Sequence, residues 1–312
     1  MGRFILRRIL LGGVALVGAM VLLFILARAA GDPRYILLGA GGGYEIPKEV
    51  WDRLGRELGL DKPPPIQFAY WVWNVLQGDF GDSVGQQRPV LQLIREKAPA
   101  TVQLAISAWL LGTLIGVPLG VFSATHRGRF LDYVARGFAL LGQASPSFWV
   151  GIVLIFFFAV HLQWLPVGTK GEGIAIRNFI LPTITLGWAP AASYLRLTRT
   201  AMLEVLDSEY IKFARAKGVN YFTVVWKHAF KNAIIPPLTL SVFLLFGFMN
   251  GAVIVETVFS WPGLGRLAVE ALSSNDFPLL SAIILIFGAG FVLVVLLLDI
   301  LYALVDPRIR YT

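Results

Sequence analysis

The sequence has no cysteine, only three histidines and few charged residues. Without cysteine the chain can form no disulfide and no thiolate metal site, and it gives no indication of the redox compartment. Charged residues make up 15% of the 312 residues, compared with about 25% in soluble domains. With 56% hydrophobic residues and a mean hydropathy of +0.70, this composition indicates that most of the chain faces lipid or other helices.

Motifs for nucleotide binding and catalysis are missing too. There is no Gly-x-x-x-x-Gly-Lys-Ser/Thr loop, and Gly263-Leu264-Gly265 does not begin a dinucleotide fingerprint. The histidines, His126, His161 and His228, lack metal-ligand spacing and are interpreted as interfacial polar residues. No nucleophile–base arrangement occurs. The sequence therefore predicts a chain that is not an enzyme, with no catalytic residue, no metal site and no cofactor of its own.

Six charge-free apolar runs are long enough to cross a bilayer core of about 30 Å as helices. They are Ile9–Ala27, Ala98–Thr125, Gly137–Val160, Asn178–Leu195, Asn232–Val255 and Phe277–Leu298. We expect an all-α membrane protein with six transmembrane helices. Pro118, Pro146, Pro182 and Pro190 lie in or near these runs and predict kinks. The first run is longer than the apolar core of about 7–15 residues in a signal peptide, so we expect it to be retained.

The placement of Lys and Arg predicts the orientation. If the N-terminus is cytoplasmic, the cytoplasmic segments hold fifteen of these residues and the two short outside loops hold three. The other nine lie in the long segment from Arg28 to Lys97, where nine acidic residues balance them. Both termini are therefore predicted to be cytoplasmic. The net charge of +8 is interpreted as an orientation signal and not as a nucleic-acid-binding surface.

The predicted organisation has four parts. Residues 1–30 form a spanning helix, 31–97 an extracytoplasmic region, 98–305 a core of five helices with a cytoplasmic hairpin at 204–232, and 306–312 a cytoplasmic tail. In the outside region we expect a flexible run at 39–43 and a helix over Pro47–Leu60. The aromatic stretch Gln67–Leu76 is interpreted as an interfacial belt, with contact to an external partner or substrate as the alternative.

Two patterns in the core limit its function. Ala108, Gly112, Gly116 and Gly120 recur every four residues, a ridge suited to close helix packing either within the chain or with another subunit. No ionisable residue lies deep in any run, and Glu256 and Asp299 lie near the ends of the last two. This absence argues against a proton- or ion-coupled transporter, which usually buries such groups at mid-membrane.

The segment Glu209–Pro237 is charged and helix-forming, although it lies between two apolar runs. The sequence predicts a helix over Glu209–Lys217 that stops at Gly218, and a second helix over Tyr221–Lys231 that is capped by Asn220. The apolar residues of this hairpin need a surface: Ile211, Ala214, Val219, Phe222, Val225 and Trp226. A hairpin that rests on lipid is one interpretation. The small residues at its turn favour a surface held by another protein.

Several motifs resemble those of known transporters. Ala214-Arg215-Ala216-Lys217-Gly218 followed by Ile234-Ile235-Pro236 resembles the EAA loop of ABC-importer permeases, although only Ala214 of the Glu-Ala-Ala triplet matches. Three stretches resemble the dipeptide/oligopeptide (and nickel) permease family: residues 256–265 (ETVFSWPGLG), 145–149 (SPSFW) and 306–308 (DPR). The N-terminal helix with its long outside loop is similar to the first of the two paired permeases of that family.

This resemblance implies a type I ABC importer transmembrane fold in the cell membrane. The implied partners are a second permease subunit, two ABC ATPase subunits that bind ATP and Mg, an extracytoplasmic substrate-binding protein and membrane lipid, with no nucleic acid. The implied ATPase-coupling residues are Glu209, Lys212, Ala214, Arg215, Ala216, Lys217, Gly218, Phe222 and Trp226. The family motif after the fifth run comprises Glu256, Trp261, Pro262, Gly263 and Gly265.

The resemblance also implies the role of each coupling residue. Ala214 and Gly218 would allow close approach, and Phe222 and Trp226 would anchor the hairpin. Lys212, Arg215 and Lys217 would steer the ATPase or pair with acidic groups on it. Dipeptides or oligopeptides are the expected cargo, with nickel complexes, oligosaccharides and glutathione as alternatives. Interpretations from other classes are a stand-alone channel or secondary transporter, and a membrane scaffold.

Overall fold

The computed structural model describes residues 2–29, 31, 34, 47–57, 60–168 and 176–305. Its regular elements in these ranges are helices, and one isolated bridge joins Asp82 to Pro89. Five of the six apolar runs lie almost wholly in single long helices, as predicted. These are α1 (Gly2–Ala29), α5 (Val90–Thr125), α8 (Ile176–Leu206), α12 (Ile235–Val258) and α14 (Phe277–Val305).

By length and hydropathy, fewer helices qualify as membrane spans than the six that the sequence predicted. Among the described residues, three helices qualify by themselves, in α1, α5 and α14. Two bent pairs raise the number to five if each pair is one span. The helix α8 does not qualify by this criterion, although it is 31 residues long. Its polar residues include Arg196, Arg199 and Glu204 near one end.

The third apolar run is bent at Pro146, as the sequence predicted, but the bend breaks the helix instead of only kinking it. It is divided into α6 (Phe130–Ala144), α7 (Ser147–Leu154) and the π-helical segment η1 (Ile155–His161), with a bend of 107° between α6 and the rest. Ser145 and Pro146 at the break have extended backbone angles. Proline has no N–H to donate and disfavours a helical conformation in the preceding residue, so the break falls at Pro146.

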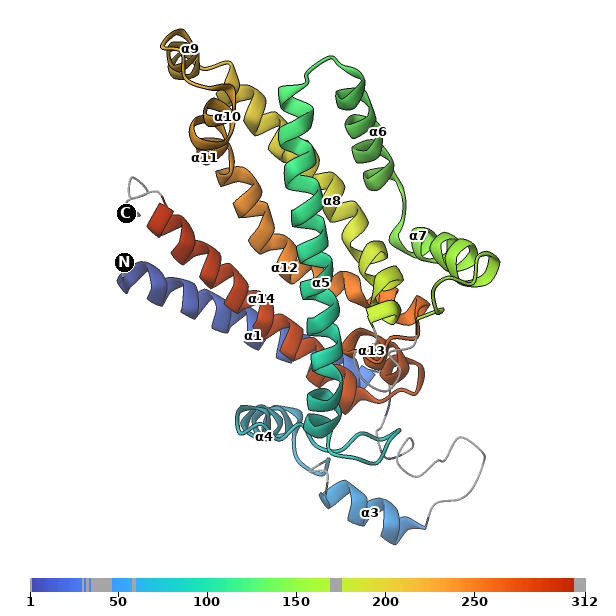
Figure 1. Ribbon diagram of the computed structural model, residues 1–312. Coiled ribbons are helices and arrows are strands. Elements are labelled where there is room, and N and C mark those ends of the chain that lie inside the picture. The colour runs from blue at the N-terminus through green and yellow to red at the C-terminus, as the bar shows by residue number, and fades with distance from the viewer. Residues whose placement is uncertain are drawn as a thin grey trace. The chain divides into compact units, whose positions relative to one another are not determined.

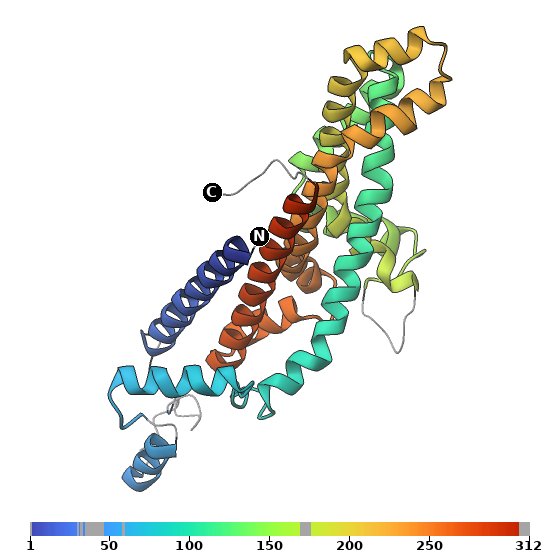
Figure 2. The same ribbon diagram turned by 90° about the vertical axis from the view of Figure 1, so that its left-hand side faces the viewer.

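The chain divides into two compact units, Met1–Ala98 with Leu267–Thr312, and Pro99–Arg266. In the first unit, α1 and α14 run side by side (Figures 1 and 2). Gly12 faces Val292 closely, so that a side chain there would collide with it. This packing leaves most of α1 exposed, as expected for a helix surrounded by lipid.

Between α1 and α5, the described part of the first unit contains two helices. The predicted helix at Pro47 is confirmed as α3 (Lys48–Glu57), and the aromatic stretch forms α4 (Pro64–Leu76). Phe68 and Trp71 of α4 stack on Phe24 of α1, with ring centroids 5.4 and 6.3 Å apart. Tyr70 and Trp73 are exposed, which is compatible with both the interfacial belt and the contact with an external partner or substrate. The predicted flexible run at 39–43 lies outside the described residues.

A buried carboxylate, that of Asp276, fixes the segment around Ser83 to the start of α14. Asp276 accepts hydrogen bonds from the Ser83 hydroxyl at 2.5 Å, from the Gly85 amide at 3.1 Å and from the Leu279 amide at 3.2 Å. The last of these caps the first turn of α14. One side chain therefore caps the start of a helix and also holds Gly85, which is 191 positions away in the sequence.

In the second unit, α5, α6, α7 and α12 surround α8. The ridge of small residues on α5 packs against α8, which decides between the two alternatives for Gly112, Gly116 and Gly120 in favour of contacts within the chain. A β-carbon on Gly112 would lie 3.4 Å from Pro190, and one on Gly120 would lie 2.6 Å from Thr198. Such close backbone approach is the usual reason for small residues at membrane helix contacts.

Candidate functional site

The predicted hairpin is present at one end of the second unit, next to the connection between α5 and α6 (Figure 1). Its first arm is α9 (Glu209–Ala216), as the sequence predicted. Gly218 follows with a φ of +77°. The Gly218 amide donates to the Arg215 carbonyl at 3.0 Å, and the Val219 amide donates to the Ala214 carbonyl at 3.3 Å. This pair of bonds is the Schellman motif, so the predicted glycine stop is confirmed.

The second arm begins at the predicted cap. The Asn220 side chain accepts a hydrogen bond from the Phe222 amide at 2.8 Å. The arm then runs through α10 (Tyr221–Thr223), η2 (Val224–Ala229) and α11 (Phe230–Ala233). The π-helical segment in the middle was not predicted. After one intervening residue, the fifth span begins as α12 at Ile235. It carries Pro236 and Pro237 in its first turn, where proline costs no hydrogen bond.

One face of the hairpin is buried inside the chain itself. Ile211 and Ala229 are completely buried, and Val225 is 3% exposed. They belong to one apolar cluster with residues from the ends of two long helices, Val121 and Ala124 of α5 and Ala201, Met202 and Leu206 of α8. The sequence led us to expect that the whole apolar set needed an external surface, whereas Ile211 and Val225 find theirs in the hairpin's own unit.

The opposite face of the hairpin, called the outer face here, exposes large aromatic rings. Its members Phe213, Tyr221 and Phe222 are 62%, 62% and 68% exposed. Trp226 is half-buried and stacks between Phe222 and Phe230, with centroid distances of 6.1 and 5.3 Å. Trp226 therefore supports Phe222 from within. Exposed aromatic residues that are held rigidly are typical of protein interfaces.

Two of the basic residues on the hairpin have partners inside it. The Lys212 ammonium lies 2.7 Å from a Glu209 carboxylate oxygen, and the Lys217 ammonium lies 4.4 Å from the centre of the Phe213 ring. The Lys212–Glu209 pair is exposed on both sides, and such pairs contribute about 0.2–1 kcal/mol. Both cations can therefore turn to an external partner at little cost. Ala216 and Gly218 are exposed, and nothing lies within 4 Å of a β-carbon built on Gly218.

A latch that the sequence did not reveal closes the hairpin. The Asn232 amide group donates to the Tyr210 hydroxyl at 2.8 Å and to the His228 carbonyl at 3.1 Å. Tyr210 lies in the first arm and Asn232 lies in the second. Their separation of 22 positions matches no local motif, so the pair is visible only in three dimensions.

The family motif after the fifth span surrounds a buried carboxylate. Glu256, which is fully buried, accepts from the Thr101 hydroxyl at 2.6 Å and from the Arg266 amide at 3.0 Å. Thr101 in turn accepts from the Leu264 amide at 2.7 Å, at the start of α13 (Leu264–Ser273). Trp261 is also fully buried, and its indole N–H donates to the Ala100 carbonyl at 3.0 Å.

Gly263 and Gly265 of this motif lie where a side chain would collide with neighbouring atoms. A β-carbon on Gly263 would collide with the Glu256 carboxylate, and one on Gly265 would lie 2.5 Å from the Val253 α-carbon. The structure thus brings Glu256, Trp261, Gly263 and Gly265 together around the first turn of α13. Thr101 completes the arrangement, although no motif in the sequence had singled it out.

The remaining motifs of the resemblance form no comparable network of contacts among the described residues. The SPSFW stretch lies at the break between α6 and α7, and its Phe148 and Trp149 are 48% and 53% exposed. The 306–308 motif and the predicted tail at 306–312 lie outside the described residues, as does the side chain of Asp299. A further buried ion pair, Asp132 with Arg199, was not predicted at all. Asp132 is the only acidic residue between Glu96 and Glu172, and this isolation could have indicated it.

Comparisons with known proteins agree with this arrangement. Residues 116–311 match the family model of the binding-protein-dependent transport system inner membrane component. The probable peptide ABC transporter permease protein y4tP of Sinorhizobium fredii is 39% identical, with all of both chains covered. The dipeptide transport system permease protein DppB of Escherichia coli is 37% identical, and the glutathione transport system permease protein GsiC of Salmonella choleraesuis is 38% identical, each with 99% of both chains covered.

Solved structures show the same fold. A chain of the MetNI methionine ABC transporter in inward-facing conformations matches with a TM-score of 0.58 and 17% identity, over 69% of this chain and 97% of that one. The fold and hairpin thus define a permease with the type I ABC importer fold. The chain belongs to the family of inner membrane components of binding-protein-dependent transport systems. It is the permease, and therefore a non-catalytic part, of an ABC importer.

Proposed function

We propose that this permease forms half of the translocation pathway of an importer for dipeptides or oligopeptides, and that its 204–232 hairpin is the docking site of an ABC ATPase. The observation that carries the docking is the division of the hairpin into two faces. Its inner face is buried in the ends of α5 and α8. Its outer face presents exposed aromatic rings next to a rigid glycine turn. Because the inner face is packed against the ends of α5 and α8, a displacement of the outer face by the ATPase would be passed on to these helices.

The cargo proposal rests on the relatives. Two of those compared are named as permeases for peptides or dipeptides, and they match over the full length of this chain. A glutathione permease is similar to the same degree, which makes glutathione the second candidate. No observation on this chain favours nickel complexes or oligosaccharides.

The proposed machine contains this chain, a second permease, two ATPases that bind ATP and Mg, and an extracytoplasmic binding protein. Closure of the ATPases around nucleotide displaces the hairpin, and the permeases then alternate between inward and outward openings. Both termini and the hairpin lie on the cytoplasmic side, because the Lys and Arg residues concentrate there. In this arrangement residues 98–305 form the permease core, 1–30 a peripheral helix and 31–97 the extracytoplasmic region.

Each hairpin residue takes a role that its exposure allows. Gly218, Ala216 and Ala214 permit close approach of the ATPase. Lys212, Arg215 and Lys217 pair with acidic groups on it, and Glu209 orients Lys212 until docking. Phe222 enters the ATPase groove, and Trp226 holds it from behind.

A pair of matched glycine substitutions tests the docking. In the assembled complex, Gly218→Trp should abolish substrate-stimulated ATP hydrolysis, because the indole occupies the surface where the ATPase lies. The control is Gly78→Trp. Gly78 follows α4 with a φ of +81°, and nothing lies within 4 Å of a β-carbon built on it. The amides of Gly78 and Asp79 donate to the carbonyls of Val75 and Asn74, which is the same Schellman pair as at Gly218. Both substitutions therefore strain the backbone alike, and both variants should insert equally.

The control variant should retain stimulated hydrolysis, because Gly78 lies in the extracytoplasmic region. Ala214→Arg should behave like Gly218→Trp without any backbone strain. Stimulated hydrolysis that is unchanged in both hairpin variants would contradict the docking role.

A further inference from the structure

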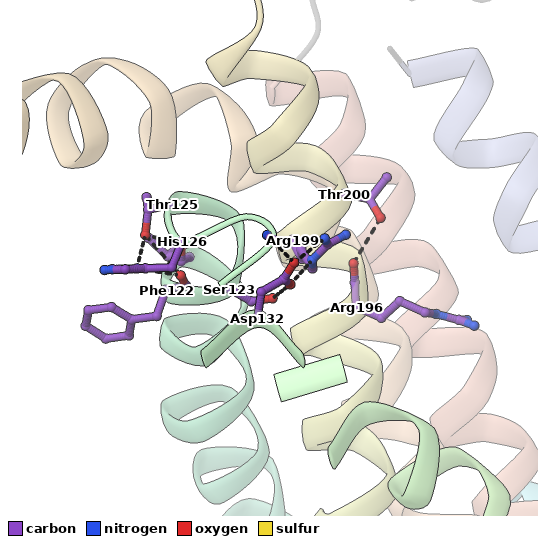
Figure 3. Close-up of polar contacts among 10 residues, drawn as sticks. Phe122, Ser123, Thr125, His126, Asp132, Arg196, Arg199 and Thr200 are labelled. Atoms are coloured by element: carbon purple, nitrogen blue, oxygen red, sulfur yellow. Dashed lines mark hydrogen bonds and ion pairs between the residues drawn. The ribbon is translucent and has the colours of Figure 1, made fainter. Parts of the chain in front are cut away.

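A buried ion pair joins three helices beside the hairpin (Figure 3). Asp132, in the first turn of α6, is 1% exposed. Its two carboxylate oxygens accept from Nε and Nη2 of Arg199 on α8, at 2.8 and 3.0 Å. They also accept from the Ser123 hydroxyl of α5 at 2.7 Å and from the Gly128 amide in the α5–α6 turn at 3.0 Å. We call these four residues the three-helix clamp.

The geometry of the clamp is that of a strong and directional contact. Arg199 binds both oxygens at once through two parallel N–H groups, which fixes the orientation as well as the distance. The three donor residues come from three segments of the chain, which are α8, α5 and the α5–α6 turn. A carboxylate that is held in this way stabilises one relative placement of its three helices. Buried charge pairs are best attested where they specify an arrangement of elements rather than where they add stability.

The clamp adjoins the apolar cluster that seats the hairpin. Ser123 lies between Val121 and Ala124 of that cluster on α5, and Arg199 lies within one turn of Ala201 and Met202 on α8. That cluster includes residues of α5, α8 and the hairpin. The clamp adds the first turn of α6 to the same two helix ends. A displacement of the hairpin therefore reaches α6 through Asp132 and Arg199.

We infer that Asp132 and Arg199 are positioning residues for energy coupling. They make the hairpin and the ends of α5, α6 and α8 move as one body, so that work from the ATPase reaches the bent pair α6–α7. Without the clamp, the α5–α6 turn around Gly128 absorbs the displacement. This inference rests on the proposed docking of the hairpin, and it makes a separate statement about where the motion goes afterwards.

The test uses Asp132→Asn and Arg199→Lys in the complete complex in liposomes. Asparagine keeps the shape of the carboxylate and removes its charge, whereas lysine keeps the charge and removes the two-pronged contact. In both variants ATP hydrolysis should stay within about two-fold of the unsubstituted complex, because the outer face of the hairpin is intact. Transport per ATP hydrolysed should fall by about ten-fold. The control is Arg127→Ala, which removes only the exposed pair with Asp207, 3.5 Å long, and should leave the ratio unchanged.

A distance measurement separates this role from simple stabilisation. Cysteines are introduced at Val134 of α6 and Lys227 of the hairpin, which are both exposed, and each carries a spin label. Because the chain has no cysteine of its own, these are its only two labelling sites. In the unsubstituted complex their distance distribution should be the same in the nucleotide-free and ATP-trapped states. In Asp132→Asn it should change between the two states.

Any of three results would overturn the inference. If transport and ATP hydrolysis fall in proportion, or if neither variant assembles, the clamp serves folding. The third result is an unchanged ratio of transport to hydrolysis together with a distance between the two labels that stays the same in both nucleotide states of Asp132→Asn. These results differ from a failure of the docking proposal, in which Gly218→Trp retains stimulated hydrolysis whatever the clamp variants do.

Discussion

The Thr101 hydroxyl donates a hydrogen bond of 2.6 Å to the carboxylate of Glu256, which lies 155 positions away in the sequence. The same hydroxyl oxygen accepts from the Leu264 amide at the start of α13. Thr101 therefore joins α5 to the motif that follows the fifth span. Around this contact the backbone turns sharply enough that Gly263 and Gly265 have no room for a side chain.

Thr101→Val should destabilise the permease. Valine has nearly the same shape, but it leaves the Leu264 amide without its acceptor and Glu256 without one donor in a buried place. The expected cost is about 1–3 kcal/mol. The measurement is the thermal unfolding midpoint of the purified complex in detergent, with Thr101→Ser as the control that keeps the hydroxyl. Equal midpoints for the valine and serine variants would refute the role assigned to Thr101.

Gly116→Ala should impair the folding of the second unit. The added carbon would collide with the carbonyl oxygen of Ala191 and lie 2.6 Å from the Tyr194 β-carbon. Gly137→Ala is the control, because that glycine also lies in a helix, α6, and nothing surrounds it within 4 Å. Alanine favours a helix over glycine by about 1 kcal/mol, so the control should be neutral or slightly stabilising. The measurement is the yield of monodisperse protein after extraction, and similar losses in the two variants would count against the packing described.

Tyr210→Phe should loosen the hairpin without unfolding the unit. It removes the hydroxyl that Asn232 binds, at a cost of about 0.5–1.5 kcal/mol. Amide hydrogen exchange in residues 221–233 should become faster, whereas exchange in the middle of α8 should not change. Tyr221→Phe is the control, since Tyr221 lies on the outer face and is 62% exposed. If both variants exchange at the unsubstituted rate, the latch has no part in holding the arms.

Local signals were sufficient to predict the hairpin. The glycine stop at Gly218, the cap at Asn220 and the start of α12 at its two prolines each depend on a few neighbouring residues. Helix positions followed from apolar runs for a similar reason, because a membrane leaves the backbone few alternatives. The bend at Pro146 shows the limit of that argument. A proline can kink or break a helix, and the surrounding packing decides which.

The contacts that hold the helices together could not be predicted. The latch, the Asp132–Arg199 pair and the Thr101–Glu256 bond each join residues 22 to 155 positions apart. No periodicity relates such residues, and each partner alone resembles an ordinary polar residue near a helix end. The division of the hairpin into a buried and an exposed face was also hidden. Ile211 and Phe213 are both apolar, but only the packing on α5 and α8 shows that Ile211 is already buried.

The central claim is that this permease works as one subunit of an ATP-driven importer of peptides. The most direct measurement is purification of the tagged chain in mild detergent with identification of every bound protein, followed by uptake of a labelled dipeptide into liposomes that contain the assembly. The account predicts that a second permease and P-loop ATPases stay bound, and that uptake requires ATP and the binding protein. A chain that purifies alone and passes solute without ATP would contradict it.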